Sequence, residues 1–369
     1  MAFPYSIRNI DTLDTPALVV STEGVKRNIQ TLIDMIDDVK RLRPHVKTHK
    51  TQQVTRLLQT AGIDKFKCAT IAEAEMLAMC QAKDVLMAYQ PNIAKQLRWV
   101  NLIKKYPDTR FSCLVDNLEI GISLSKLATE NNLKLGVYID LNVGMNRTGI
   151  LPEKAFRLFH EIMSLPHLIL RGLHAYDGHI HNPDFAIRQK EADESFNKVE
   201  QLLHQLGKSD TALLEIVMGG ASTYPIHSKR QRVVCSPGTF VFWDKGYQTA
   251  FPEQAFEPAV WVACRIVSLP DAGKICLDVG HKSIAAENDL SRRIYFPHEP
   301  DAQFIGQSEE HLVIELASTH TYQVGDVFYG IPIHICPTCA LYECLHVVED
   351  GILTGEEWQV IARNRKITC

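Results

Sequence analysis

The stretch Leu42-Arg43-Pro44-His45-Val46-Lys47 is the first of eight short apolar or β-branched runs between residues 41 and 242. The other seven are Lys65–Thr70, Val85–Tyr89, Phe111–Val115, Leu133–Asp140, Leu168–Tyr176, Leu213–Met218 and Arg232–Cys235. Between them, stretches such as Ile71–Gln81 and Phe185–Gln205 carry apolar residues at helical spacing. Eight strand–helix repeats over about 200 residues match a (β/α)8 barrel, with an open doubly wound sheet as the weaker alternative.

After Phe256 the pattern changes from alternating strands and helices to strands alone. The strand-like runs are Val260–Leu269, Lys274–Val279, His311–Leu316 and Val327–Ile333, separated by Gly, Pro, Asp and Asn. We therefore predict a barrel over residues 12–250 and a mainly antiparallel β domain over residues 251–369, which residues 1–11 could join. The early run Ala17–Val20 could belong to either domain.

The composition points to a small-molecule partner. Hydrophobic residues make up 46% and charged residues 22% of the 369 residues, and the net charge of −4 offers no broad basic surface for nucleic acid or acidic lipid. The first ten residues lack a basic region followed by an apolar core, and no run approaches the roughly 20 apolar residues of a membrane span. We expect a cytoplasmic protein whose ten cysteines are reduced.

Functional groups of a parallel barrel lie where its strands end, at the carboxyl-terminal face. The first run and the three residues after it, from Arg43 to Lys50, are dense in ionisable groups. Strand alternation would place His45 and Lys47 on one face. If that face points inward, Lys47 is a partly buried amine suited to imine chemistry, and the equally plausible alternative is a solvated basic loop.

Two glycine-containing loops follow the last two predicted barrel strands. They are Gly219-Gly220-Ala221-Ser222-Thr223 and Pro237-Gly238-Thr239. Small residues let backbone N–H groups approach a phosphate, and these two loops are the frequent phosphate site of a (β/α)8 barrel. An inward-facing lysine together with a phosphate-binding site is what an enzyme with the cofactor pyridoxal 5′-phosphate (PLP) requires.

Several motifs in this order resemble the D-threonine aldolase and D-serine dehydratase family, which has the alanine-racemase-like PLP fold. They are Asp14-Thr15-Pro16-Ala17-Leu18, Arg43 to Lys50, the Gly219-Gly220 loop, Leu277-Asp278-Val279-Gly280 with Lys282-Ser283, and Pro332-Ile333-His334-Ile335-Cys336. The resemblance covers nearly the whole chain. It implies a PLP barrel followed by a β domain, a D-amino acid substrate, and a homodimer.

The resemblance also implies roles for individual residues. Lys47, rather than Lys50, matches the lysine that binds PLP covalently, and Arg147 and Tyr176 look like the arginine and tyrosine near the cofactor ring. The positions that match the phosphate site are Gly220, Ser222, Thr223, Gly238 and Thr239, with Tyr247 as a weaker match.

A metal site is predicted at His334 and Cys336. Side chains two positions apart in a strand project from the same face, so the His334 imidazole and the Cys336 thiolate could reach one ion. The resemblance implies that the matching metal ligands are a histidine and an aspartate in the aldolases, and a histidine and a cysteine in the dehydratases. Cysteine favours zinc, with manganese or magnesium as alternatives. In another interpretation, Cys336 and Cys339 form half of a structural zinc site or a redox pair, although no second Cys-x-x-Cys lies nearby.

The expected activity is that of a PLP- and metal-dependent lyase of D-3-hydroxy amino acids. It would act by dehydration, as in D-serine dehydratase, or by retro-aldol cleavage, as in D-threonine aldolase. His179, which alternates with His181 after Tyr176, is the candidate base, although both histidines could be ordinary loop residues. A PLP-dependent racemase and a non-catalytic PLP-binding protein are the alternatives.

Overall fold

The computed structural model describes residues 7–317 and 320–369. Within them the chain divides into two compact units. The barrel unit consists of residues 32–47, 55–238 and 364–369, and the β unit consists of residues 7–31, 48–54 and 239–363. Neither unit is formed by one continuous segment, because each consists of three segments between which the chain passes through the other unit.

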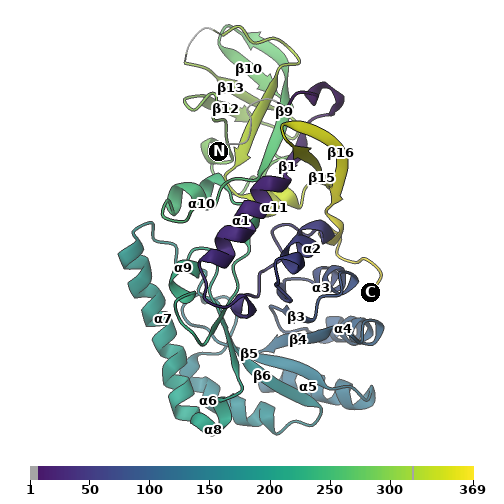
Figure 1. Cartoon of the computed structure of the whole chain (residues 1–369), viewed down its shortest axis with the longest axis vertical. Helices are drawn as coiled ribbons and strands as arrows, with labels where there is room; N and C mark the ends of the chain where they lie inside the picture. Colours follow the sequence, from purple (N-terminus) through teal and green to yellow (C-terminus); the bar gives the residue numbers. More distant parts are fainter. Residues whose placement is uncertain (1–6, 318–319) are drawn as a thin grey trace. The chain divides into compact units, whose positions relative to one another are not determined.

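The barrel unit is built on a parallel sheet whose strands follow one another in chain order (Figure 1). Its strands are β2 (Lys65–Cys68), β3 (Asp84–Met87), β4 (Arg110–Val115), β5 (Leu135–Asp140), β6 (Leu168–Ala175), β7 (Glu215–Met218) and β8 (Val233–Cys235). They agree with seven of the eight predicted runs.

The eighth predicted run, Leu42–Lys47, forms no regular strand but takes the place of one. Leu42 makes a parallel bridge to Cys235 of β8, and His45 makes a parallel bridge to Lys67 of β2. Pro44 cannot donate a ladder hydrogen bond, which explains why the pairing stays irregular. The segment therefore links both edges of the sheet, and the predicted (β/α)8 architecture is confirmed.

The helices connect successive strands, as Figure 1 shows for the barrel unit. The α-helices of the described residues are α1 (Thr22–Asp34), α2 (Gln52–Thr60), α3 (Ile71–Met79), α4 (Ile93–Lys105), α5 (Leu118–Glu130), α6 (Pro152–Met163), α7 (Phe185–Leu206), α8 (Lys208–Thr211), α9 (Tyr224–His227), α10 (Lys245–Ala250) and α11 (Ile335–Cys339). Side chains cap several of them: Thr70, Asn92 and Asn117 accept hydrogen bonds from the first turns of α3, α4 and α5. No helix among the described residues is long and apolar enough to cross a membrane.

The amino-terminal end of the barrel holds a buried network of charges. Arg43 is fully buried and forms ion pairs with Asp84 (2.6 Å) and Glu215 (2.8 Å), the first residues of β3 and β7. Lys65 and Arg110 complete the pairing of these two carboxylates. Because the functional end of a parallel barrel is the opposite one, this network holds the fold rather than acting on a ligand.

The β unit contains a mainly antiparallel sheet in the order β12-β13-β10-β9-β1-β15-β16, and β14 pairs with β9 and β11. The strands are β1 (Ala17–Ser21), β9 (Val260–Asp271), β10 (Lys274–Leu277), β11 (Ile294–Tyr295), β12 (Gln303–Gln307), β13 (Leu312–Glu315), β14 (Val327–Pro332), β15 (Cys344–Glu349) and β16 (Ile352–Gln359). Strand β1, which the sequence left between two domains, pairs here with β9 and β15. A core that includes Val19, Trp261 and Tyr329 covers one face of the sheet.

Candidate active site

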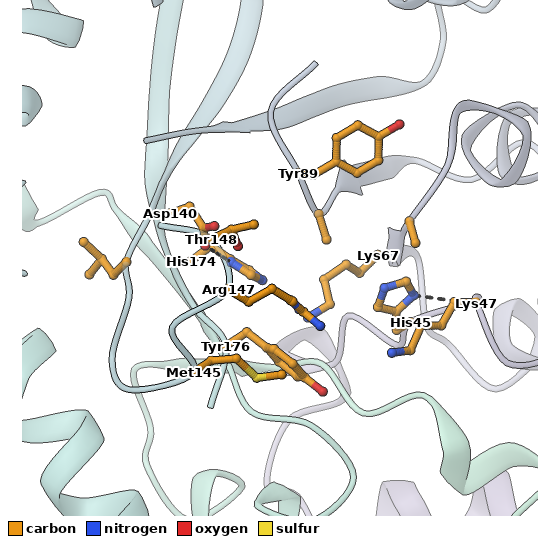
Figure 2. Close-up of a pocket in the computed structure, with 13 residues that line it drawn as sticks. His45, Lys47, Lys67, Tyr89, Asp140, Met145, Arg147, Thr148, His174 and Tyr176 are labelled. Atoms are coloured by element: carbon orange, nitrogen blue, oxygen red, sulfur yellow. Dashed lines mark hydrogen bonds and ion pairs between the residues drawn. The ribbon is translucent and has the colours of Figure 1, made fainter. Parts of the chain in front are cut away.

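A cavity of about 250 Å³ lies at the carboxyl-terminal ends of the barrel strands (Figure 2). It is lined by His45, Lys47, Lys67, Ala69, Ala88, Tyr89, Asp140, Leu141, Met145, Arg147, Thr148, His174 and Tyr176. Three of the residues predicted for the site, Lys47, Arg147 and Tyr176, are therefore brought to one cavity from three separate parts of the barrel. Three of the lining residues carry a cationic group and one carries a carboxylate.

Lys47 reaches the cavity because the segment before it is held between two strands. The backbone N–H groups of His45 and Val46 donate to Pro237 and Lys67, and the Lys47 N–H donates to Nδ1 of His45 (3.2 Å). Lys47 and His45 are both half-buried and line the same cavity. The alternative of a solvated basic loop does not describe this segment.

The ring of Tyr176, just after β6, lies next to two of the cations (Figure 2). The Arg147 guanidinium and the Lys67 ammonium each lie 5.3 Å from the centre of the ring. The aromatic face attracts both charges. On another side, a Cβ added to Gly220 would lie 3.2 Å from the Tyr176 ring, so glycine allows the Gly219–Thr223 loop its close approach.

Lys67 is a functional candidate that the sequence did not single out. Its side chain is 2% exposed, in the third position of β2. Burial, and then the positive charge of Lys47, lowers the pKa of Lys67 to about 7. Among the described residues its ammonium forms no hydrogen bond or ion pair. The sequence offered one clue: Lys65 and Lys67 are two positions apart in a predicted barrel strand, so their side chains must project from the same face of the sheet.

Asp140 and His174, from the ends of β5 and β6, are a second unpredicted pair. The Nδ1 atom of His174 lies 2.7 Å from Oδ1 of Asp140. Burial lowers the pKa of His174, although its hydrogen bond to Asp140 opposes that change. A neutral imidazole with its proton on Nδ1 follows, and its Nε2, which is buried without a hydrogen bond partner, is left as an acceptor.

The Gly219–Thr223 loop is held in shape by a buried carboxylate. Gly219 adopts a φ of +83°, and the Gly220 N–H donates to Oγ1 of Thr223 (3.2 Å). That hydroxyl donates to Asp177 (3.0 Å), which also contacts Nε2 of His227 (2.7 Å). Because the Thr223 hydroxyl hydrogen is used by Asp177, any contribution of Thr223 to a phosphate would come from its backbone. Ser222 is buried in the same loop.

The second predicted phosphate loop divides between the two units. Gly238 ends the barrel unit, following Pro237, whose carbonyl accepts from His45. Thr239 begins the β unit, where its Oγ1 lies 3.6 Å from Sγ of Cys336. Tyr247, the weaker match, lies in α10 and packs against the ring of Trp243 at 5.2 Å.

The prediction that His334 and Cys336 lie in a strand is wrong. Strand β14 ends at Pro332, and His334 is the residue before α11, which contains Cys336. The two side chains still meet through the turn, and a hydrogen bond joins them. Burial would lower the pKa of His334, but Cys336 and Glu287, whose Oε1 lies 2.5 Å from Nδ1, raise it to about 9. The Thr48 hydroxyl, one residue after Lys47, lies 3.1 Å from the Cys336 sulfur.

The other two cysteines of this region do not join Cys336 in a metal cluster. Cys339 is fully buried, and burial raises its pKa to about 12. Among the residues that the structure describes, the group of three potential ligands within 4.8 Å of one another is Cys344, His346 and Glu357, on β15 and β16. The structural-zinc and redox-pair interpretations of Cys336 and Cys339 gain no support from this arrangement.

His179, the predicted base, is not among the residues that line the cavity. Its ring packs against Gly144, where an added Cβ would lie 2.5 Å from Nε2, and its Nδ1 is buried without a hydrogen bond partner. The exposed His181 contacts the His179 carbonyl through Nδ1 (2.6 Å). The two histidines therefore have different surroundings, and His179 supports the loop that leads to Arg147.

The comparison with known families agrees with this geometry. The model described as "alanine racemase, N-terminal domain" matches residues 20–245, more than half of the chain. The chain belongs to the alanine racemase N-terminal domain family. A second model, described as "putative serine dehydratase domain", matches residues 259–348. The resemblance predicted from the motifs is confirmed.

Three known proteins match along nearly the whole chain. The chain is 24% identical to the 3-hydroxy-D-aspartate aldolase of Paracoccus denitrificans, over 96% of this chain and 93% of the relative. The crystal structure of D-threonine aldolase from Filomicrobium marinum has a TM-score of 0.86 at 24% identity, covering 95% of each chain. A cysteine-to-alanine variant of D-threo-3-hydroxyaspartate dehydratase in its metal-free form has a TM-score of 0.81 at 20% identity, covering 94% of this chain and 97% of the other.

Proposed function

We propose that this protein is a PLP-dependent lyase of D-3-hydroxy amino acids, with PLP bound covalently at Lys47. The observation that carries the proposal is the cavity in which Lys47, Arg147 and Tyr176 meet. The aldolases and the dehydratase that resemble this chain over nearly its whole length support a lyase rather than a racemase. The homodimer and the cytoplasmic location expected from the sequence stay predictions.

The residues of the cavity fit PLP. The cofactor needs an amine for its aldehyde, an aromatic or apolar surface for its ring and donors for its phosphate. Lys47 offers the amine and Tyr176 the surface. The Gly219–Thr223 loop approaches Tyr176 through Gly220, and with Gly238 and Thr239 it is the proposed phosphate cradle. When bound, PLP serves as an electron sink for the charge left on the substrate's Cα.

Lys47 then has two tasks in the proposed reaction. Its Nζ would hold the cofactor, and in the dehydratase reaction the same atom would accept the proton from Cα of the substrate. Arg147 is exposed at the cavity and fits the carboxylate of the amino acid or the cofactor ring. His179 is the proposed base for the 3-hydroxyl proton in the aldolase reaction, although it lies outside the cavity lining.

A divalent metal, with zinc favoured, is proposed at His334 and Cys336. The donor set fits, because an imidazole in contact with a thiol is a common pair of zinc ligands, and Glu287 orients the imidazole through its other nitrogen. Such an ion would act as a Lewis acid toward the 3-hydroxyl group. Cys336 at this position favours the dehydratase, as the resemblance implied.

Product identification tests the proposal. The protein is loaded with PLP and zinc and incubated separately with D-serine, D-threonine and D-alanine, with Lys47→Ala as the inactive control. A keto acid with ammonia identifies a dehydratase, and glycine with an aldehyde identifies an aldolase. Formation of an L-amino acid, or turnover by Lys47→Ala equal to that of the unaltered protein, would contradict the proposal, as would the absence of any product.

A further inference from the structure

Lys67 differs from the other buried cations of the barrel. Arg43 pairs with Asp84 and Glu215, and Arg188 donates to the carbonyls of Asn182 and Pro183. The Lys67 ammonium, in contrast, forms no hydrogen bond or ion pair with the described residues and lies 5.3 Å from the centre of the Tyr176 ring. A buried charge without a counter-ion is costly, so its environment is incomplete without an anion.

The ammonium of Lys67 faces the cavity, not the packed interior. Its side chain lines the cavity together with Lys47 and is 2% exposed (Figure 2). Asp140, the carboxylate in the cavity lining, is already bonded to His174 at 2.7 Å, and Asp177, which also attracts the Lys67 charge, is bonded to Thr223 and His227. The missing anion is therefore supplied by whatever occupies the cavity.

The chemistry of PLP identifies that anion. In PLP the ring oxygen is attached to the carbon next to the one that bears the aldehyde. If Lys47 holds the aldehyde, as proposed above, this oxygen lies next to Lys47, and Lys67 shares the cavity with Lys47. We propose that Lys67 is a positioning residue whose ammonium binds the ring oxygen of PLP and keeps that oxygen anionic. This inference rests on the cofactor part of the proposed function.

The electrostatics of the site agree with this role. Burial, and secondly Lys47, lowers the pKa of Lys67 to about 7, so that an anionic partner is needed to hold its proton in the neutral range. The charged and titratable groups that surround it are Lys47, Arg43, Asp140, Asp177, His45, His174, Arg147 and Tyr176. Lys67 in turn stabilises the more negative form of the cofactor, which holds one proton fewer.

The test is the colour of bound PLP followed against pH in the full-length protein. Lys67→Met removes the charge at similar length, and Lys67→Gln is a second variant in case the first does not fold. Without the cation, the deprotonated form of the cofactor loses its stabilisation, so the pKa of the cofactor rises. We therefore expect the midpoint of the absorbance change to rise by about one pH unit or more. Lys67→Arg restores the charge and should bring the midpoint back toward that of the unaltered protein. Lys126→Met, on the exposed surface of α5, is the control and should not change the midpoint.

Three results would overturn the inference. One is an unchanged midpoint in both neutral variants of Lys67. Another is an unchanged midpoint with a loss of activity confined to substrates that carry a second carboxylate, which would make Lys67 a substrate-binding residue. The third is recovery of borohydride-fixed cofactor on Lys67 itself. In the first two cases fixation on Lys47 would leave the proposed function intact, whereas a protein that binds no PLP would refute both.

Discussion

The substitution Asp177→Asn tests whether the Gly219–Thr223 loop binds the phosphate of PLP. Asp177 is completely buried and accepts hydrogen bonds from Thr223 and His227. Burial would raise its pKa, but His227 and Thr223 lower it, so Asp177 is charged at neutral pH. The substitution keeps the size of the side chain and changes only its charge and one acceptor.

The expected loss follows from the direction of these hydrogen bonds. Arg230 contacts Nδ1 of His227 and has only donors, so Nδ1 accepts and Nε2 carries the proton toward position 177. The single oxygen of an asparagine can accept from His227, which leaves its NH2 group facing the Thr223 hydroxyl. One hydrogen bond to a charged group is lost, worth about 1.5–3 kcal/mol. If the loop must be ordered to bind phosphate, PLP affinity falls by about 10- to 150-fold.

Equilibrium titration of the PLP-free protein with PLP and with pyridoxal measures this effect. We expect weaker binding of PLP and nearly unchanged binding of pyridoxal, which has no phosphate. Asp184→Asn is the matched control, because Asp184 caps α7 and asparagine caps helices equally well. Equal PLP affinity of Asp177→Asn and the unaltered protein, or an equal loss for PLP and pyridoxal, would refute the argument.

Three further predictions concern stability and the metal. Arg43→Met leaves the buried Asp84 and the half-buried Glu215 with fewer partners and should lower the free energy of unfolding of the barrel by about 3 kcal/mol in urea unfolding. Arg157→Met, which removes an exposed ion pair on α6, should change it by less than about 0.5 kcal/mol, and equal losses would contradict the role of the Arg43 network. Burial would raise the pKa of Glu75, but hydrogen bonds from the carboxyl-terminal backbone lower it to about 2, so its stabilisation is present above pH 4.5 and is lost as the pH falls toward 2. Thermal unfolding of Glu75→Gln should therefore depend less on pH over this range than that of the unaltered protein. Cys336→Ser should lower zinc content in metal analysis and activity together, and full activity after chelation would argue against the metal.

The order of the barrel strands could be predicted because each buried strand is a short apolar run bounded by polar residues. The exceptions have physical causes. The apolar run Leu42–Lys47 predicts a strand, but its proline limits the pairing to isolated bridges on both sides. Strands β12 and β16 were missed because they carry polar and exposed residues that produce little apolar alternation. Strand β11 has only two residues, and β15 was missed although Leu345 and Val347 alternate and are buried.

The candidate site was predicted only in part, because side chains that meet in space are far apart in the sequence. Lys47, Arg147 and Tyr176 were found through the family resemblance, and the cavity brings them together. Lys67 was missed because an alternating Lys-Phe-Lys pattern suggests a solvent-facing strand surface, whereas the inner face of a closed barrel is also buried. The turn at His334 was missed because the apolar residues of β14 are those of an ordinary strand, and they do not show whether the strand continues past Pro332 or gives way to a short helix.

The most direct test of the account is to locate the covalent attachment of PLP. The protein is incubated with PLP, reduced with borohydride and digested, and the modified peptide is identified by mass spectrometry. The account predicts one reduced pyridoxyl group on Lys47 and none in Lys47→Ala. A pyridoxyl group on Lys50 or Lys67 in the unaltered protein, or no modified peptide at all, would contradict the central claim.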